Sequence, residues 1–282
     1  MSLNVGILGF GYLGKELKEV LETHTDVWVT RQHATDQAGK QDSSSQVVTF
    51  RWTDPKTWSN LPDDNSILIV TIPPTNQNIT EEKQHVVNWC DWMRHNRSHI
   101  NRCVYISSTG VYPNQPGVWK ESSRFECDSL KGKLRLLTET AMADHFDTVI
   151  IRPGAIYGKE RNIGHRILAG KPVPKGEQPV HRIHVHDLAR LVDRAITSDN
   201  FPNVINAIDL ESETTKNVAD WLINQPYFPA AQDVAIEYRT DFQTRKFNLT
   251  QPDRKICNQL LVEMGFTLRF PSYKEGLAHA FG

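Results

Sequence analysis

The sequence predicts an α/β protein with a doubly wound parallel sheet and a small, partly intercalated C-terminal α/β lobe. Three observations predict this fold. Short runs of consecutive apolar residues recur through the first half of the chain, segments with apolar residues at helical spacing separate them, and a glycine-rich turn follows the first run. Continuous apolar runs are typical of strands covered on both faces. Their alternation with helices of about 10–15 residues predicts βαβ units.

The elements of the first half follow in order along the chain. We expect strands where a short apolar run is bounded by turn residues, at 3–8, 27–30, 46–50, 66–72, 103–106 and 148–151. We expect helices where apolar residues recur every three or four positions, at 12–21, 81–95 and 129–145. Together these elements predict a doubly wound α/β domain over residues 1–155.

The composition changes after residue 155, where 159–181 is rich in Gly, Pro and Lys. A strand, a helix and a second strand then follow, and we expect residues 182–208 to return to the first domain. The small lobe that would shape a substrate site consists of 156–181 and 209–282. Within it we expect helices at 215–223 and 252–264 and a strand at 234–238.

The composition excludes some classes of function. The 282 residues carry 32 Lys and Arg against 33 Asp and Glu, a formal charge of -1. Without clustered basic residues a dedicated nucleic-acid binder is not expected. The longest apolar run, Ile67–Ile72, is far shorter than the roughly 20 residues of a membrane helix, and the start is not signal-like. We therefore predict a cytoplasmic protein with no membrane partner and reduced cysteines.

A glycine-rich turn follows the first predicted strand and opens the first predicted helix. It reads Gly9-Phe10-Gly11-Tyr12-Leu13-Gly14, a G-x-G-x-x-G pattern. In such a turn the first glycine allows a tight bend, the second lets the backbone approach a pyrophosphate, and the third lets the helix pack closely. The helix N-terminus then binds the anion. We therefore expect these six residues to bind a dinucleotide, as in a Rossmann fold; a packing turn without a ligand is the alternative.

The end of the second predicted strand indicates which dinucleotide is bound. An acidic residue that binds the ribose 2′-hydroxyl is expected about 20 residues after the glycines. The chain has Arg31 there, and its next acidic residue is Asp36. A guanidinium cannot accept a hydrogen bond, but it pairs well with a 2′-phosphate. Arg31 therefore favours NADP(H) as the cofactor, with NAD(H) as the alternative if the arginine is only solvated.

Three further segments carry a resemblance to a known family. They are Ile-Ser-Ser-Thr-Gly-Val-Tyr-Pro at 106–113, Arg-Pro-Gly-Ala-Ile-Tyr-Gly at 152–158 and Ile-His-Val-His-Asp-Leu-Ala at 183–189. Over nearly its whole length the chain resembles the NAD-dependent epimerase/dehydratase family of the extended short-chain dehydrogenase/reductase superfamily. The short C-terminal lobe and the glycine pattern look most like its atypical, YeeZ-like branch, because the usual family motif is G-x-x-G-x-x-G.

The resemblance implies roles for individual residues. Ser108 stands in the place of the family's catalytic Ser/Thr, whose hydroxyl hydrogen-bonds a substrate oxygen during hydride transfer. For Tyr112 the resemblance implies mainly a structural or substrate-contact role, and we keep it as a candidate substitute for the missing catalytic acid. The cofactor contacts implied beyond the glycine turn are Thr71, Ile72 and Pro73 beneath the adenosine and ribose, Ser107 beside the catalytic serine, and Pro153, Gly154 and Ile156 around the nicotinamide. No metal ion is implied.

The family's catalytic Tyr-x-x-x-Lys pair is missing. Its two residues share one helix face, where the Tyr transfers a proton to or from the carbonyl. Family spacing puts Lys131 and Arg135 in these places, and no tyrosine lies between Tyr112 and Tyr157. Either tyrosine is a candidate substitute acid. Lys131 is an unconventional acid or, together with Arg135, part of a solvated or phosphate-facing side.

Two other groups of residues leave alternatives open. His181, His184 and His186 suggest a metal site, but no carboxylate or cysteine completes a ligand set, so substrate contact or packing is expected. Arg51 and Trp52 stand where family members often carry an Asp that recognises adenine. Either side chain stacks on the base, or Trp52 packs at the edge of the sheet.

The sequence therefore supports two hypotheses of function. The first is an NAD(P)-binding, epimerase/dehydratase-like oxidoreductase that acts on a small carbonyl or sugar-type substrate, with Ser108 polarising that substrate and an unconventional proton donor. The second is a non-catalytic NADP(H)-binding sensor or scaffold, which the loss of the Tyr/Lys pair favours. The resemblance further implies a homodimer through the helices at 81–95 and 129–145.

Overall fold

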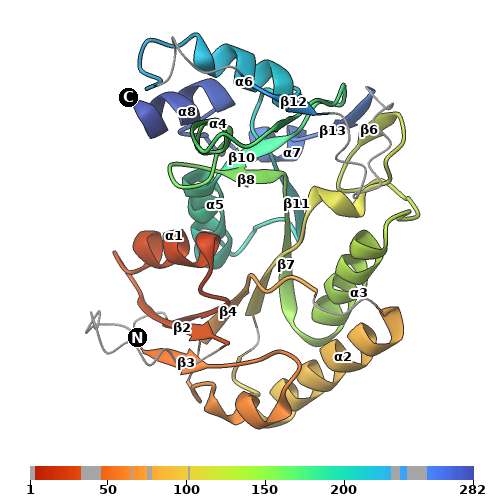
Figure 1. The fold of residues 1–282 in the computed structure, drawn as a ribbon. Coiled ribbons are helices and arrows are strands. Elements are labelled where there is room, and N and C mark those ends of the chain that lie inside the picture. Colours follow the sequence, from red (N-terminus) through yellow and green to blue (C-terminus); the bar gives the residue numbers. More distant parts are fainter. Residues whose placement is uncertain are drawn as a thin grey trace. The chain divides into compact units, whose positions relative to one another are not determined.

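The computed structural model describes residues 4–32, 46–64, 66–74, 78–100, 102–229, 236–239 and 253–282. The chain divides into two compact units, each assembled from segments far apart in the sequence (Figure 1). Unit 1 comprises Met1–Val111, Cys127–Arg152 and Ala189–Val204, and unit 2 comprises Tyr112–Glu126, Pro153–Leu188 and Ile205–Gly282. A search of the described residues for a helix long and apolar enough to cross a membrane finds none.

A seven-stranded sheet forms the centre of the fold, with the strand order β11-β7-β5-β4-β1-β2-β3. Its strands, in chain order, are β1 (Asn4–Leu8), β2 (Asp26–Arg31), β3 (Val47–Thr49), β4 (Ser66–Val70), β5 (Arg102–Ile106), β7 (Asp147–Pro153) and β11 (Val204–Ala207). Every pairing from β7 through to β3 is parallel. The winding reverses between β1 and β4, and ligands bind at the carboxyl ends of the strands at such a switch point. The predicted fold class is confirmed.

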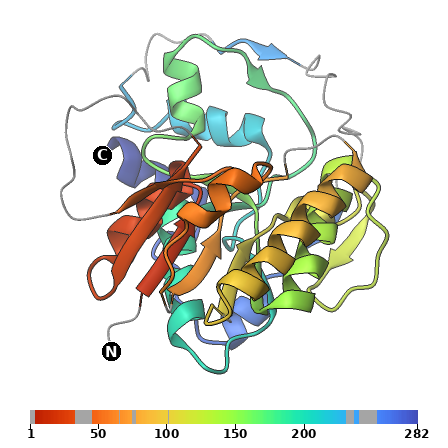
Figure 2. The same ribbon diagram turned by 90° about the horizontal axis from the view of Figure 1, so that it is seen from below.

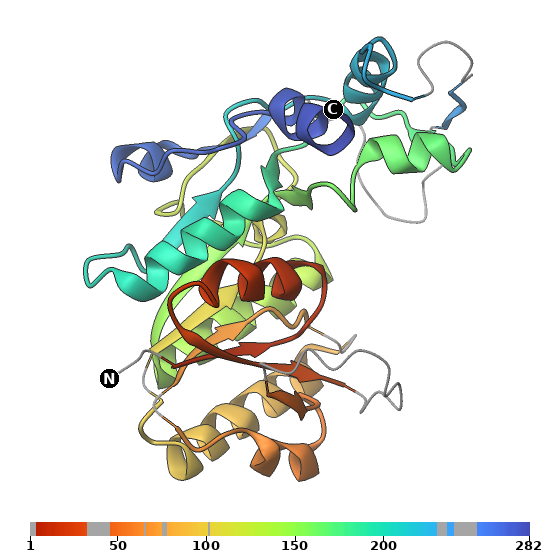
Figure 3. The same ribbon diagram turned by 90° about the vertical axis from the view of Figure 1, so that its left-hand side faces the viewer.

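Helices cover both faces of this sheet in unit 1. Figure 2 shows α2 (Ile79–Asn96) and α3 (Leu130–His145) side by side on one face, and Figure 3 shows α1 (Tyr12–Leu21) and α5 (Val185–Thr197) on the other. Side chains fix where two of the helices begin. Asn78 caps α2 and Ser129 caps α3 by accepting hydrogen bonds from backbone N–H groups of the first turn.

Aromatic side chains fill the core between the sheet and α2. Trp52 and Trp89 are stacked with ring centroids 4.6 Å apart, and the edge of Phe50 packs against both rings. Trp52 is 6% exposed and Trp89 is fully buried. Of the two alternatives for Trp52, packing is therefore the one that the structure shows.

Unit 2 contains short elements around its own apolar core. Three pairs of parallel strands are present: β6 (Gly117–Trp119) with β13 (Arg254–Ile256), β8 (Ala155–Tyr157) with β10 (Arg182–His184), and β9 (Val173–Pro174) with β12 (Tyr238–Arg239). Its other helices are α4 (Ile163–Leu168), α6 (Thr215–Ile223), α7 (Gln259–Glu263) and α8 (Tyr273–Phe281). Leu222, Phe228, Tyr273 and Leu277 are buried together in this core.

The helix predicted at 252–264 is wrong in its first half. Residues Arg254–Ile256 form strand β13, and the helix begins only at Gln259. The reason is tertiary, because β13 pairs with β6 and Nε of Arg254 donates to the carbonyl oxygen of Pro113. The first two positions of the strand predicted at 234–238 lie outside the described residues, and of the other three only Tyr238 belongs to a strand, β12.

The two units differ from the predicted domains, 1–155 with 182–208 against 156–181 with 209–282, at two places. Residues Tyr112–Glu126 belong to unit 2, since β6 pairs with β13 there. Residues 182–208 were predicted to return to the first domain. Of these, Ala189–Val204 belongs to unit 1, whereas residues 182–188 and 205–208 belong to unit 2. The first domain is therefore interrupted earlier in the sequence than the change of composition indicated.

Candidate cofactor-binding and active site

The glycine turn lies between β1 and α1, at the switch point of the sheet. Gly9 has a φ of +109°, a conformation that other residues rarely adopt. A Cβ on Gly14 would lie 2.3 Å from the carbonyl oxygen of Gly9, so only glycine allows α1 to start this close to the turn. The bend and the close packing predicted for these two glycines are both present. Gly11 differs, because it is exposed and a Cβ there would meet no atom of the described residues within 4 Å.

Two threonines hold the turn in place, one from each of the strands β2 and β4 that flank β1. The N–H of Gly9 donates to Oγ1 of Thr30, and the N–H of Phe10 donates to the carbonyl oxygen of Thr30, both at 3.0 Å. On the other side, the hydroxyl of Thr71 donates to the carbonyl oxygen of Gly9 at 2.8 Å. Thr71 was predicted only as a cofactor contact, and the role of Thr30 was missed. A hydroxyl residue near the end of the strand that follows the glycine turn and its helix is the signal that could have found it.

The N-terminus of α1 fits a diphosphate. Its N-cap residue, Gly11, supplies no capping side chain, and the first turn contains no acidic residue. The first amide groups of a helix have no partner within the helix, and the helix dipole adds positive potential. The Leu13 side chain is buried, at 7% exposure, so only its backbone is available to a ligand. Open space at Gly11 over an uncapped, acid-free helix end is the arrangement that an anion needs.

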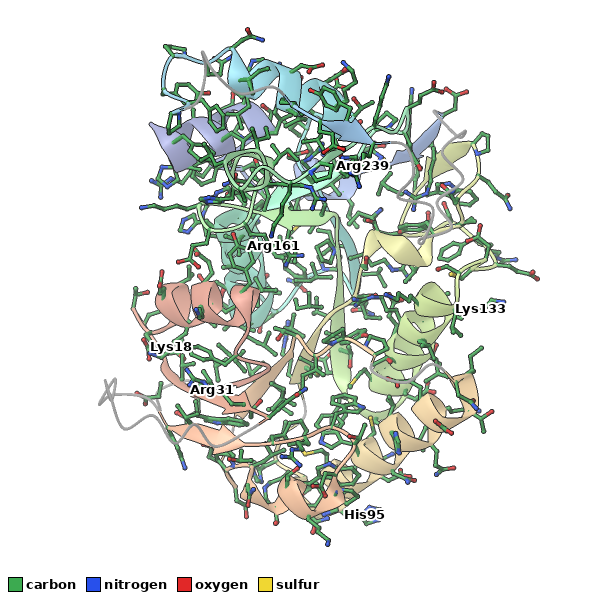
Figure 4. The ribbon with its side chains drawn as sticks, viewed as in Figure 1. Lys18, Arg31, His95, Lys133, Arg161 and Arg239 are labelled. Atoms are coloured by element: carbon green, nitrogen blue, oxygen red, sulfur yellow. The ribbon has the colours of Figure 1, made fainter. Side chains whose placement is uncertain are left out.

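Arg31 ends β2 and faces this turn (Figure 4). Its guanidinium carbon lies 5.0 Å from the centre of the Phe10 ring, a cation–π contact that holds the side chain over the turn. Among the described residues no acceptor takes a hydrogen bond from this guanidinium. Toward the described part of the chain, the donors of Arg31 are therefore unused at the strand end where the 2′ position of an adenosine is expected.

The loop after β4 carries the next predicted contacts. Thr71 and Ile72 are half-buried and Pro73 is exposed. Thr71 is fixed to β1, because its N–H and its hydroxyl both donate to the carbonyl oxygen of Leu8, at 2.9 and 3.1 Å. This loop and the glycine turn thus leave the sheet from adjacent parallel strands, β4 and β1.

Ser107 and Ser108 follow β5 but have different surroundings. Ser108 is half-buried, and its Oγ accepts a hydrogen bond from the N–H of Gly110 at 3.0 Å, within the short 3₁₀ helix η2 (Thr109–Val111). That bond uses a lone pair and leaves the O–H to donate. Ser107 is buried, and its hydroxyl donates to Oε1 of Glu139. Its hydroxyl is therefore committed inside unit 1, and the predicted contact of Ser107 with the cofactor stays a prediction.

A buried ion pair that sequence reasoning missed supports this serine segment. Nε and Nη2 of Arg152 donate to the two carboxylate oxygens of Glu139 at 3.0 and 2.6 Å. Both residues are buried, at 6% and 4% exposure. Since Glu139 also accepts from Ser107, α3, β5 and β7 are joined through one carboxylate.

The residues at the places of the missing Tyr/Lys pair also lie on α3. Lys131 is exposed, so the burial that an unconventional acid would require is not present. Arg135 is half-buried, and its Nη1 donates to the carbonyl oxygen of Ser107 at 3.0 Å. Lys131 is thus exposed to solvent, whereas Arg135 hydrogen-bonds the backbone of Ser107, the residue before Ser108.

The remaining predicted cofactor contacts belong to unit 2. Pro153 is the last residue of β7, Gly154 lies between β7 and β8, and Ile156 lies within β8. The N–H of Gly154 donates to the carbonyl oxygen of Ala207 at 3.0 Å, and a Cβ on Gly154 would lie 2.5 Å from the carbonyl oxygen of His181. The backbone packing inside unit 2 therefore requires a glycine at this position whatever it binds.

The two candidate substitute acids are both buried in unit 2. The hydroxyl of Tyr112 donates to Oδ1 of Asn206 at 2.8 Å, and the hydroxyl of Tyr157 donates to the carbonyl oxygen of Ser272 at 2.9 Å. Burial raises the pKa of Tyr157 far above its usual range. Proton transfer by either hydroxyl would need these hydrogen bonds to break, so the geometry favours structural roles for both.

Two of the histidines that suggested a metal site, His181 and His184, each accept one backbone hydrogen bond within unit 2, while the buried Nε2 of His184 has no hydrogen-bond partner among the described residues. Nε2 of His181 accepts from the N–H of Ile256, and Nδ1 of His184 accepts from the N–H of His186. Burial lowers the pKa of His181 and of His184 to about 4, so both rings are neutral near pH 7. In the described ranges no group of three or more His, Cys, Asp or Glu side chains could hold a metal ion. Packing explains these two rings.

A buried carboxyl in unit 2 makes stability depend on pH. Asp209 is 3% exposed, and burial raises its pKa from an ordinary value of 3.8 to about 8, although Arg182 acts in the opposite direction. Between these values the folded protein holds a proton that the unfolded chain releases, so this group destabilises the fold increasingly as the pH rises. We expect Asp209→Asn to stabilise the protein relative to wild type by at least about 1 kcal/mol more at pH 8.5 than at pH 5.

Urea denaturation of wild type and variant at both pH values measures this difference. Asp199→Asn, at an exposed position, is the control and should show no such pH dependence. An unchanged gap between wild type and Asp209→Asn at the two pH values would show that Asp209 is ionised in the folded protein throughout.

Comparisons with known proteins agree with this geometry. The model of a family described as NAD(P)H-binding matches residues 10–199. Among solved structures, UDP-N-acetylglucosamine 4-epimerase from Methanobrevibacter ruminantium M1, in complex with UDP-N-acetylmuramic acid, is 16% identical with a TM-score of 0.78 and covers 100% of this chain and 97% of its own. UDP-glucuronic acid 4-epimerase from Bacillus cereus, in complex with UDP-glucuronic acid and NAD, is 15% identical with a TM-score of 0.77 and covers 99% and 98%.

A third structure, the Bordetella bronchiseptica enzyme WbmH in complex with NAD+, is 18% identical with a TM-score of 0.76 and covers 99% of this chain and 97% of its own. The search of curated proteins found no match. These solved structures share the fold, and the family model covers the glycine turn from Phe10 onward, both serines and the Glu139–Arg152 pair. The chain therefore belongs to the NAD(P)H-binding family and has the Rossmann fold of the NAD-dependent epimerases.

Proposed function

We propose that the protein is an NADP(H)-dependent oxidoreductase of the epimerase/dehydratase type. The observation that carries the proposal is the N-terminus of α1, where Gly11 leaves open space, no side chain caps the helix and no acidic residue lies in the first turn. The diphosphate would lie on the backbone of Gly9 to Gly14. Thr71, Ile72 and Pro73 would contact the adenosine and ribose, and Pro153, Gly154 and Ile156 remain the predicted contacts of the nicotinamide.

The phosphorylated form of the cofactor is favoured by the end of β2. Arg31 stands where NAD-binding folds carry an acidic residue, and no described residue accepts a hydrogen bond from its guanidinium. A 2′-phosphate supplies the acceptors that this group lacks, whereas a 2′-hydroxyl would have to donate to it. NADP(H) is therefore the better match to this position.

The substrate class follows from the serine and from the structural neighbours. The nicotinamide supplies or accepts a hydride when bound, and the substrate oxygen then changes its charge. Ser108 would donate its O–H to that oxygen, while the N–H of Gly110 keeps the Ser108 oxygen in place. Since two of the neighbours are UDP-sugar 4-epimerases, a small carbonyl or sugar-type molecule is the substrate class that we propose.

Binding and turnover together test this proposal. We expect the purified protein to bind NADPH in calorimetric titration and to oxidise it with a carbonyl compound from a panel of aldehydes, ketones and keto-sugars. Ser108→Ala should lower turnover by about 10²–10³-fold, because an oxyanion donor is removed, and leave NADPH affinity unchanged within about threefold. Ser107→Ala should lower stability, because the Ser107 hydroxyl donates to Glu139, and a loss of NADPH affinity in this variant would support the predicted contact of Ser107 with the cofactor.

The outcomes separate the two hypotheses. Tight NADPH binding without turnover on any member of the panel would favour the sensor or scaffold. Equal turnover of Ser108→Ala and wild type would remove Ser108 from the reaction. Absence of binding by either nicotinamide nucleotide would contradict the proposal as a whole.

A further inference from the structure

A buried histidine joins β10 to the C-terminal strap of unit 2 (residues 269–281), which contains α8. His184 is the last residue of β10, and its ring lies against the ring of Phe270 with the two centroids 3.9 Å apart. The ring of Tyr157, from the paired strand β8, meets the His184 ring edge-on at 5.2 Å. Because His184 is only 4% exposed, its ring is enclosed between β8 and the strap.

Hydrogen bonding determines where the His184 ring carries its proton. Its Nδ1 accepts from the backbone N–H of His186, in the first turn of α5, at 3.2 Å and so acts as a helix cap. A ring nitrogen that accepts a hydrogen bond carries no proton, so the neutral ring is protonated on Nε2. A second proton would have to bind Nδ1, where it would face the N–H of His186. Protonation therefore removes this cap and places a charge in a buried, largely apolar site.

The strap is attached to the same part of unit 2. The two carboxylate oxygens of Asp187 accept from the N–H groups of Arg269 and Phe270, both at 2.8 Å. The hydroxyl of Tyr157 donates to the carbonyl oxygen of Ser272, directly before α8, at 2.9 Å. The position of the strap therefore depends on β8, on the end of β10 and on the first turn of α5.

The groups that face His184 oppose a further positive charge. They are His186 on α5, Arg269 at the start of the strap and His279 on α8, whose ring centroid lies 6.3 Å from that of His184. Tyr157, on β8, is uncharged, since burial raises its pKa far above the usual range. Burial, with a smaller effect of these three cations, lowers the pKa of His184 from an ordinary value of 6.5 to about 4.

We propose that His184 is an acid-sensitive latch, whose protonation loosens the C-terminal strap from β10 and β8. Once the strap has opened, water solvates the ring and stabilises the imidazolium. Above pH 6.5 the ring is neutral in the closed and the open form alike. Below that value the open form takes up a proton first, because the pKa in the closed form is about 4. The strap therefore loosens as the pH falls between these two values, whether or not a nucleotide is bound.

Hydrogen exchange of the full-length protein, followed by mass spectrometry at pH 7 and pH 5, tests the latch. Protection factors correct for the pH dependence of exchange itself. For peptides from the strap they should fall about twentyfold at the lower pH, the change that pKa values of 6.5 and about 4 in the open and closed forms require. Peptides from β1 and β4 should change by less than about threefold, because these strands belong to unit 1.

Two substitutions of His184 remove the titrating ring in different ways. His184→Asn places an amide oxygen where Nδ1 accepts the N–H of His186, so the helix cap is kept. His184→Phe keeps the ring contact with Phe270. In both variants the protection of the strap should be equal at the two pH values to within about threefold, even where it is lower than in wild type. His95→Asn, at an exposed position on α2, is the control and should keep the wild-type response.

His279→Gln distinguishes His184 from the exposed histidine of the strap itself. This variant removes a neighbouring cation, so the fall in protection should remain and begin at a higher pH. Loss of the response in His279→Gln but not in His184→Asn would overturn the proposal and assign the response to His279. A fall of the wild-type size in both His184 variants would overturn it as well, and so would strap protection in wild type that is equal at pH 7 and pH 5.

Discussion

Glu139→Ala is expected to lower the free energy of unfolding by about 3–5 kcal/mol. The Glu139 carboxylate is buried and accepts from Nε and Nη2 of Arg152 at 3.0 and 2.6 Å and from the hydroxyl of Ser107. Its removal deprives a guanidinium that is 6% exposed of this counter-charge. A buried charge without its partner is strongly unfavourable because the interior replaces water poorly. Urea denaturation measures the difference.

An exposed acidic residue of the same unit serves as the control. Glu22 on α1 pairs with Lys18 at 3.3 Å across one helical turn, and we expect Glu22→Gln to change stability by less than about 0.5 kcal/mol. Replacement of both buried partners, Glu139→Leu with Arg152→Met, should recover much of the loss, since no unpaired charge remains. A loss in Glu139→Ala no larger than that in Glu22→Gln would show that the pair contributes little.

Gly11→Val is expected to weaken NADPH binding by about a hundredfold, or about 2.8 kcal/mol. A Cβ at this position meets no protein atom, and its backbone angles, φ of -91° and ψ of -154°, are ordinary for any residue. The fold should therefore lose no more than about 1 kcal/mol, the cost of a poorer N-cap. In the proposed binding mode, the added side chain would occupy the space through which the diphosphate approaches the backbone. Calorimetric titration measures the affinity.

Gly14→Ala should lower stability, whereas Gly11→Val should lower mainly the affinity for NADPH. Its Cβ would lie 2.3 Å from the carbonyl oxygen of Gly9, so the helix must shift and stability should fall by about 1–3 kcal/mol. Comparison of the two variants separates loss of a ligand from damage to the turn. Wild-type affinity in a folded Gly11→Val variant would mean that the nucleotide lies elsewhere.

The first half of the fold could be predicted because its signals are local. The runs that became β1 and β4 are apolar almost throughout, since the structure buries them on both faces, and the helix predicted at 12–21 agrees with α1. The roles of Gly9 and Gly14 could also be predicted, because this fold needs a glycine for the tight turn and another for close packing of the helix. Because the apolar runs, the helical spacing and the glycine turn all indicate the same fold, the fold class could be predicted from the sequence alone.

The parts that could not be predicted depend on contacts between distant segments. Arg254–Ile256 reads as helical but pairs with β6, about 140 positions earlier in the chain, and pairing overrides a weak local preference. Glu139 and Arg152 gave a signal that the sequence analysis did not use. A glutamate on the buried face of α3 and an arginine at the end of an apolar strand each require a partner of opposite charge, and together they predict the pair.

The interleaving of the two units has a consequence for biosynthesis. Unit 1 receives its last segment, Ala189–Val204, only after Tyr112–Glu126 and Pro153–Leu188 of unit 2 have been made. A nascent chain that has emerged only to the end of β7 therefore lacks residues 189–197 of α5, which cover part of one face of the sheet. Because domains can begin to fold during synthesis, apolar strands of unit 1 remain exposed on this face until residues 189–197 have been made. The delay exposes the growing chain to chaperones until residue 204 is available.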